Sequence, residues 1–289
     1  MAKSGGVTAR NTRQGFRSEY IVRYILSAFG TAVEVSQGND LGIDILCNLT
    51  SFDGLLITYR SSYGVQVKSH GYDFKYKGKQ ATKWLSKLEY PLLLASVDKE
   101  NARIRIYSCW NLNRYLLMLN LDDENSFPDE IKFVPSEDDD LKEPTVDGVI
   151  PVGKPILDFN YFDIEDEVSW ERYYKVLDGW LEIDNKNYLL RRVGISCAFG
   201  YIKWEVNRAL DESVRMWYKP YFYSPQHTNK IKDILVEALV PLGLYTKASS
   251  HGGQIQPFKD EFNDLKRYVD KYLIDRMDDH GKDLFKAEI

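Results

Sequence analysis

Cysteines and long apolar runs are scarce in this sequence. Its 289 residues include three cysteines, Cys47, Cys109 and Cys197, which form no CxxC pair and have no histidine at metal-ligand spacing. This usage is typical of reduced thiols in a cytoplasmic protein. No apolar run approaches the ~20 residues of a membrane span, and the polar, basic N-terminal residues lack the apolar segment of a secretory signal. We therefore expect a cytoplasmic protein with no membrane partner.

Acidic residues are few in the first part of the chain and abundant in the rest. Residues 1–110 contain 15 basic and 9 acidic residues, a net charge of +6. The remainder contains 23 basic and 34 acidic residues, a net charge of −11. A basic N-terminal part indicates a polyanionic partner, which the acidic remainder would repel.

The first 120 residues alternate between helix-like and strand-like patterns. Helical spacing occurs at 17–29 and 81–88, a polar loop at 71–79, and apolar runs of strand length at 31–35, 43–49, 55–59, 63–68, 92–97 and 103–110. The order of these elements predicts an α/β (α+β) domain over residues 1–120.

A second, mainly α-helical domain is expected at residues 151–289. Residues 121–147 contain 11 acidic residues and only two basic ones, and three prolines interrupt them. We interpret residues 121–150 as an acidic linker. Apolar residues then recur at helical spacing at 168–181, 201–217, 229–242 and 258–277.

Two short motifs suggest a metal and phosphate site. Gly42-Ile43-Asp44 begins one expected strand, and Gln66-Val67-Lys68 ends another about one hairpin later. Strand side chains alternate between faces, so Gln66 and Lys68 share a face, and Asp44 meets both if the two strands pair. A carboxylate, an amide oxygen and the Val67 carbonyl are hard ligands that suit Mg²⁺, and an ammonium group suits phosphate. The alternative is a strand-edge Asp44 beside a solvated strand face.

With Gly15-x-x-x-Glu19, these motifs resemble the PD-(D/E)XK nuclease superfamily, in its Mrr-like and resolvase-like branches and in domain-of-unknown-function family 4365. The resemblance covers residues 10–115 and includes Ser69 after the Gln-x-Lys. It implies a restriction-endonuclease-like mixed sheet core flanked by helices. It also implies that Asp44 is a metal ligand, that Lys68 is the catalytic lysine, and that Gln66 occupies the variant third motif position.

Glu19 is the helical acid that the resemblance implies, and it would join the metal site. The alternative reading is structural, because an acidic residue in the first turn of a helix is stabilised by the helix macrodipole. Gln66 replaces the glutamate that many superfamily members have. The replacement removes one negative charge and should weaken metal binding.

A basic stretch with interleaved aromatic residues follows the motifs. Its lysines are Lys75, Lys77, Lys79, Lys83 and Lys87, and its aromatic residues include Tyr76 and Trp84. Lysines of this kind can follow a phosphate backbone while aromatic rings stack on bases. The alternative is a solvated basic helix face.

These features predict a metal-dependent endodeoxyribonuclease that uses Mg²⁺ (or Mn²⁺). The resemblance suggests a role in bacterial defence against phage or foreign DNA. The C-terminal helices would mediate a homodimer, bind a partner protein or restrain the nuclease. The alternatives are a catalytically inactive nucleic-acid-binding or scaffold subunit and an RNA nuclease.

Overall fold

The computed structural model describes residues 5–35, 42–53, 56–69, 74–119, 126–136, 143–191, 195–199, 206–209 and 216–220. The chain divides into two compact units. The first unit comprises Met1–Arg191 and Ile195–Phe222, and it contains every described residue. The second unit comprises Arg192–Gly194 and Tyr223–Ile289 and lies outside the described residues.

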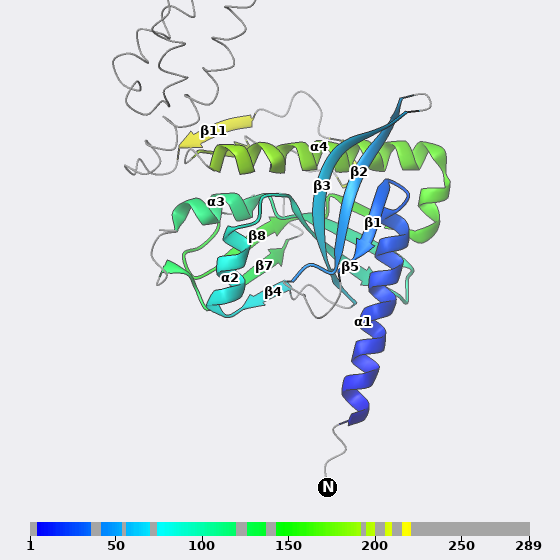
Figure 1. The fold of residues 1–289 in the computed structure, drawn as a ribbon, viewed down its shortest axis with the longest axis horizontal. Helices are drawn as coiled ribbons and strands as arrows, with labels where there is room; N and C mark the ends of the chain where they lie inside the picture. Colours follow the sequence, from blue (N-terminus) through cyan, green and yellow to red (C-terminus); the bar gives the residue numbers. More distant parts are fainter. Residues whose placement is uncertain are drawn as a thin grey trace, which may run out of the picture. The chain divides into compact units, whose positions relative to one another are not determined.

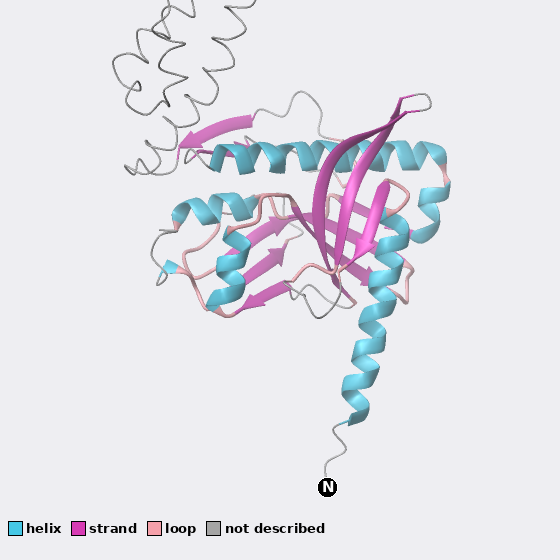
Figure 2. Cartoon of the chain, in the orientation of Figure 1, coloured by secondary structure: helices cyan, strands magenta, loops and turns pink. Residues whose placement is uncertain are grey.

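A six-stranded mixed sheet is the centre of the first unit (Figure 1). In spatial order its strands are β1 (Gly30–Glu34), β2 (Ile45–Asp53), β3 (Leu56–Lys68), β5 (Leu92–Asp98), β6 (Arg103–Ser108) and β9 (Leu157–Asn160). Neighbouring strands are antiparallel except β3 and β5, which are parallel and are joined through β4 and α2. The strands β2 and β3 form a long hairpin (Figure 2).

A smaller three-stranded sheet has the order β4 (Phe74–Lys77), β7 (Glu130–Pro135) and β8 (Val149–Gly153). Helices α2 (Lys79–Ser86) and α3 (Asn111–Met118) pack with it. The remaining strands, β10 (Ile195–Phe199) and β11 (Met216–Pro220), form an antiparallel pair. These elements and the central sheet confirm an α+β fold with a mixed sheet flanked by helices.

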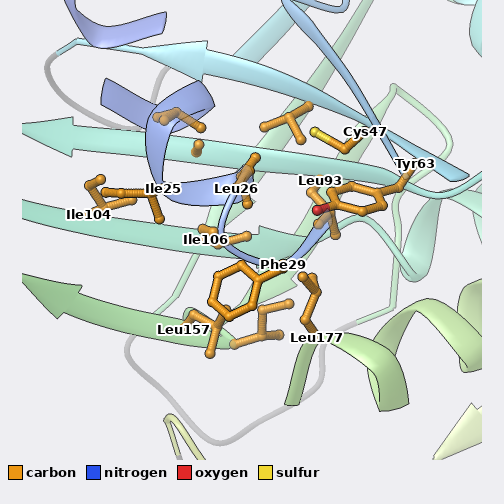
Figure 3. Close-up of a cluster of buried hydrophobic side chains, with 14 of the residues drawn as sticks. Ile25, Leu26, Phe29, Cys47, Tyr63, Leu93, Ile104, Ile106, Leu157 and Leu177 are labelled. Carbon is orange, nitrogen blue, oxygen red and sulfur yellow. The ribbon is translucent and has the colours of Figure 1, made fainter. Parts of the chain in front are cut away.

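The first hydrophobic core lies between one face of the central sheet and two helices, α1 (Gly5–Leu26) and α4 (Glu167–Arg191) (Figure 3). Phe29, just after α1, and Leu177 of α4 are buried there with Leu93 and Ile106 of the sheet. Trp170 of α4 stacks on Phe29 with ring centroids 6.1 Å apart and donates its indole N–H to the Ala28 carbonyl. These two contacts therefore hold the end of α1 against the start of α4.

The second core lies on the opposite face of the central sheet. Because strand side chains alternate, Leu94 points into this core while its neighbours Leu93 and Ala95 point into the first. The smaller sheet contributes Phe74 and Phe133, and the helices α2 and α3 close the core with leucine side chains. The β5 strand is thus apolar on both faces, as its continuous apolar sequence predicted.

The acidic segment differs from the linker that the sequence predicted at 121–150. It contains β7 and begins β8, both of which belong to the smaller sheet, and the following β9 pairs with β6 of the central sheet. Ile131 and Phe133 alternate with polar residues, so β7 buries one face although acidic residues surround it in sequence. Residues 151–191 accordingly belong to the same compact unit as residues 1–120.

Several elements differ from their predicted extents. The strands predicted at 55–59 and 63–68 are one strand, β3, and the polar loop predicted at 71–79 contains β4. The helix predicted at 168–181 is confirmed and continues to Arg191, whereas the helix predicted at 201–217 is wrong at its end, which is β11. The helices predicted at 229–242 and 258–277 lie outside the described residues.

The described cysteines agree with the expected reduced state. Cys47 and Cys109 are buried free thiols, and burial raises the pKa of Cys47 to about 12. The side chain of Cys197 lies outside the described part of the chain. No helix within the described ranges is long and apolar enough to span a membrane.

Candidate functional site

Asp44 lies where β2 and β3 begin to separate. Its backbone N–H donates to the Val65 carbonyl at 2.9 Å, and its own carbonyl accepts from the Val35 N–H at 2.9 Å. Its side chain continues this pairing, because the Val67 N–H donates to Asp44 Oδ2 at 2.5 Å. A carboxylate thus replaces a backbone carbonyl at the end of the hairpin ladder, which holds Asp44 against the Gln-x-Lys segment.

The residues around Asp44 explain why its motif begins with Gly-Ile. Gly42 has φ +90°, and a Cβ there would lie 2.3 Å from the Tyr76 ring, whose hydroxyl donates to the Gly42 carbonyl at 2.7 Å. Ile43 packs over Gly64, where an added Cβ would lie 2.7 Å from Ile43 Cδ1. Both glycines therefore allow the loop before β2 to lie close against the sheet and bring Asp44 to Val67.

Gln66 is buried with an unsatisfied oxygen. Only 6% of the residue is exposed, and Oε1 accepts no hydrogen bond within the described part of the structure. A buried acceptor without a partner costs about 1–3 kcal/mol, so such an atom is usually satisfied by a ligand, an ion or water. A ligand, an ion or a water molecule beside Asp44 would satisfy the Gln66 oxygen.

Lys68 is the last residue of β3 and is partly exposed. It shares a strand face with Gln66, two residues before it, as the sequence predicted. On the neighbouring parallel strand Lys68 is paired with Ser96, which is 9% exposed. Strand pairing thus brings Asp44, Gln66 and Lys68 together at one end of the central sheet.

Glu19 lies in the middle of helix α1. The helix begins at Gly5, so the prediction that Glu19 occupies a first helical turn is wrong and the macrodipole does not explain this residue. Burial and the nearby Arg17 guanidinium lower the pKa of Lys99, which follows β5. The segment of α1 around Arg17 and Glu19 consequently lies at the end of the sheet where β5 ends. The contribution of Glu19 to a metal site stays a prediction.

The donor atoms at this site suit a hard cation. Asp44 supplies a carboxylate whose orientation is set by the Val67 N–H, and Gln66 supplies the unsatisfied amide oxygen. Mg²⁺ and Mn²⁺ accept such oxygen ligands, and Mg²⁺ retains several water molecules when few protein ligands are present. Over the described ranges, no group of three or more His, Cys, Asp or Glu residues gathers into a metal site.

The predicted nucleic-acid-binding lysines belong to two elements. Lys75 and Lys77 alternate along β4 with the buried Phe74 and Tyr76, so they face away from the second core. The other three, Lys79, Lys83 and Lys87, recur every four residues over α2 and its C-terminal cap. Spacing of four residues places them on one helix face. The single basic stretch of the sequence is thus a strand face followed by a helix face.

The aromatic residues of this stretch have structural roles. Tyr76 is 3% exposed and stacks on Trp84 with ring centroids 6.1 Å apart. It also lies edge-on to Phe133, with centroids 5.8 Å apart, and supports Gly42. A ring buried in this way is not available to stack on a base, which was one of the two readings of the aromatic residues in this stretch. Its function is to position the loop that carries Asp44.

Comparisons with known proteins give no relative for this chain. No family model, curated protein or solved structure matches it. The likeness to PD-(D/E)XK nucleases therefore rests on the sequence motifs alone.

Proposed function

We propose that this protein is a metal-dependent endonuclease that hydrolyses phosphodiester bonds of DNA, built on a restriction-endonuclease-like fold. The observation that carries the proposal is the arrangement around Gln66. Its buried, unsatisfied Oε1 lies in the strand segment whose backbone holds Asp44, and Lys68 shares its strand face.

Each residue has a distinct role in this proposal. Asp44 and Gln66 would hold Mg²⁺ or Mn²⁺, together with the Val67 carbonyl and Glu19. A bound divalent ion polarises the phosphate and lowers the pKa of bound water. Lys68 places its ammonium beside the phosphate, where it offsets the negative charge that develops during attack. The lysines of β4 and α2 would bind the DNA backbone.

Plasmid cleavage with Mg²⁺ or Mn²⁺ tests the proposal. Asp44→Asn is the informative variant, because an amide oxygen can still accept the Val67 N–H while the charge is lost. We expect wild type to nick or cut the plasmid and Asp44→Asn to lose this activity with little change in melting temperature. Asp129→Asn is the matched control, since Asp129 is exposed. Equal cleavage by wild type and Asp44→Asn would contradict the assignment.

A second candidate function is binding of nucleic acid without cleavage, as a scaffold subunit. Gln66 favours it, because replacing a carboxylate by an amide removes one negative charge from the metal site. DNA binding by a wild-type protein that cleaves nothing with either metal would support this alternative. An RNA substrate in the same assay tests whether the nuclease prefers RNA.

The biological setting follows by analogy with the family resemblance. We place the activity in the cytoplasm, in bacterial defence against phage or foreign DNA. Residues 223–289 would mediate a homodimer, bind a partner protein or restrain the nuclease. Deleting these residues should raise nicking if they restrain it, and unchanged or lost activity would count against restraint.

A further inference from the structure

Tyr76 connects the smaller sheet to the segment that carries Asp44. It lies on β4 with its ring turned into the second core, where the residue is 3% exposed. Its hydroxyl donates to the Gly42 carbonyl at 2.7 Å. Gly42 precedes Asp44 by two residues, and Asp44 immediately precedes β2 of the central sheet. A hydroxyl of the smaller sheet therefore holds the backbone beside a predicted metal ligand.

The Tyr76 hydroxyl has a fixed direction because neighbouring rings hold its own ring. Trp84 of α2 stacks on this ring with an interplanar angle of 23°, and Phe133 of β7 meets it edge-on at 81°. The ring also lies against Gly42, where an added Cβ would be 2.3 Å from a ring carbon. Gly42 has φ +90°, a conformation that glycine adopts without strain. The loop can therefore approach the ring closely enough for the hydrogen bond to form.

The hydrogen bond at Gly42 bears on Asp44 because the residue between them is also held. Ile43 is 5% exposed and packs over the backbone of β3. The Val67 N–H then donates to Asp44 Oδ2 at 2.5 Å. A shift of the loop at Gly42 would move Asp44 relative to β3 and lengthen this bond. The same shift would change the distance from the Asp44 carboxylate to Gln66, which lies on β3.

We infer that Tyr76 is a positioning residue of the proposed reaction, and that its hydroxyl sets the affinity of the Asp44 site for its cation. For the identity of the cation, Mg²⁺ or Mn²⁺, this rests on the proposed function. Removing a group that orients a metal ligand typically weakens metal binding by ~10–100-fold. Tyr76 acts through the backbone and not on the carboxylate itself, so we expect a loss at the lower end, about tenfold.

The strand β4 would consequently serve the reaction with both of its faces. Phe74 and Tyr76 point into the second core, whereas Lys75 and Lys77 face away from it and are proposed to bind the DNA backbone. Alternate residues of one strand would thus have two different roles. Substitutions within β4 should therefore separate cation binding from DNA binding.

Hydrogen exchange in the metal-free protein tests the positioning directly. The variant is Tyr76→Phe, which keeps the ring between Trp84 and Phe133 and removes only the hydroxyl. Its matched control is Tyr115→Phe, since the Tyr115 hydroxyl is also buried in the second core but has no hydrogen-bond partner among the described residues. We expect the Val67 amide to exchange about tenfold faster in Tyr76→Phe than in wild type, and at the wild-type rate in Tyr115→Phe.

Calorimetric titration with Mn²⁺ alone measures the affinity of the site. Tyr76→Phe should bind Mn²⁺ about tenfold more weakly than wild type, at a temperature where thermal melting shows both proteins to be folded. In cleavage assays the half-saturating Mn²⁺ concentration should rise by the same factor, while the KM for DNA stays unchanged. Lys75→Gln/Lys77→Gln should give the opposite result, a raised KM for DNA and an unchanged Mn²⁺ affinity.

Equal Val67 exchange in wild type and Tyr76→Phe would overturn the inference, and so would equal Mn²⁺ affinity. The same losses in Tyr115→Phe would also overturn it, because the effect would then come from the second core in general. Wild type that binds no Mn²⁺ would contradict the proposed function and the effect on cation affinity, and Val67 exchange would still decide whether Tyr76 holds Asp44. Cleavage by wild type with unchanged exchange in Tyr76→Phe would contradict the positioning role and leave the nuclease intact.

Discussion

The two faces of the central sheet differ at the end where β3 and β5 terminate. On one face, Val67 and Val97 are buried in a continuous apolar core under α1 and α4. On the other face, the positions in the same strands are Gln66, Lys68 and Ser96. Alternation along a strand therefore lets one segment support the fold with one set of side chains and present polar groups with the other. Mutations on the two faces should separate stability from activity.

The largest effect is expected on the apolar face. Phe29 is 1% exposed and packs against Trp170, so Phe29→Ala should lower the free energy of unfolding by about 3–5 kcal/mol. Urea denaturation measures this loss. Cleavage per folded molecule should stay near the wild-type value, because Phe29 lies on the face opposite Gln66. A specific activity that falls as much as the stability would mean that the two faces are coupled.

On the polar face, Lys68→Ala should reduce the rate of cleavage by about 10²–10³-fold, the usual effect of removing a group that stabilises a developing oxyanion. The stability should change little, since Lys68 is partly exposed at a strand end. Single-turnover cleavage and thermal melting measure the two effects. Lys175→Ala, on the exposed side of α4, is the matched control. Cleavage by Lys68→Ala at the wild-type rate would remove Lys68 from the mechanism.

Asp184 on the face covered by α4 is a buried acid, and its titration should appear in the pH dependence of the free energy of unfolding. Asp184 of α4 is 1% exposed, and burial raises its pKa from 3.8 to about 7 although the Ser108 hydroxyl donates to it. The folded state therefore binds a proton that the unfolded state has lost between pH 4 and 7. Stability should fall as pH rises through this window, and the loss should be complete above about pH 7.

Asp184→Asn tests this pH dependence. Its amide resembles the protonated acid and does not ionise. The variant should gain a few kcal/mol over wild type at pH 8 and match it at pH 4, as measured by urea denaturation at both values. The neighbouring Cys109 and Tyr188 do not titrate in this window, because burial raises the pKa of each well above its usual range. Equal pH profiles for wild type and variant would contradict a raised Asp184 pKa.

The smallest effect concerns Gln66 itself. Gln66→Met fills a similar space without the unsatisfied oxygen, so it should be neutral or stabilising by about 1–3 kcal/mol in the absence of metal. Mn²⁺ should raise the melting temperature of wild type but not of Gln66→Met. Gln66→Glu should lower stability without metal and gain more from Mn²⁺ than wild type. Equal responses of all three proteins to Mn²⁺ would exclude Gln66 as a ligand.

Local patterns were enough to predict the centre of the candidate site. Asp44 immediately precedes β2 and Gln66 lies in β3, the two strands of one hairpin, and the period of two fixes which side chains share a face. The same patterns predicted β5 and the start of α4, because their apolar residues are frequent and regular. These features depend on contacts between residues that are close in sequence, so the sequence of one chain is enough to predict them.

Features that depend on distant pairing could not be predicted in this way. The strand β4 has only four residues, which is too short for a recognisable strand pattern. The strand β7 lies in acidic sequence, which hides its apolar alternation. The sequence around Tyr76 is the same whether its ring stacks on a base or supports Gly42, and only the burial of the ring distinguishes these two roles. Arg105 and Asp158 are separated by 53 residues, so their meeting depends on the pairing of β6 with β9.

The amino-acid sequence thus decided the α+β character, the Asp44 and Gln66-x-Lys68 hairpin geometry and the absence of a cysteine framework, because these follow from composition and from short-range periodicity. The tertiary structure decided that Gln66 is buried with an oxygen unsatisfied within the described residues, that the acidic segment belongs to the fold, and that Arg103 and Arg105 meet Asp158 through the pairing of β6 with β9. Burial and register are properties of strands that meet only after folding, and no local pattern specifies them.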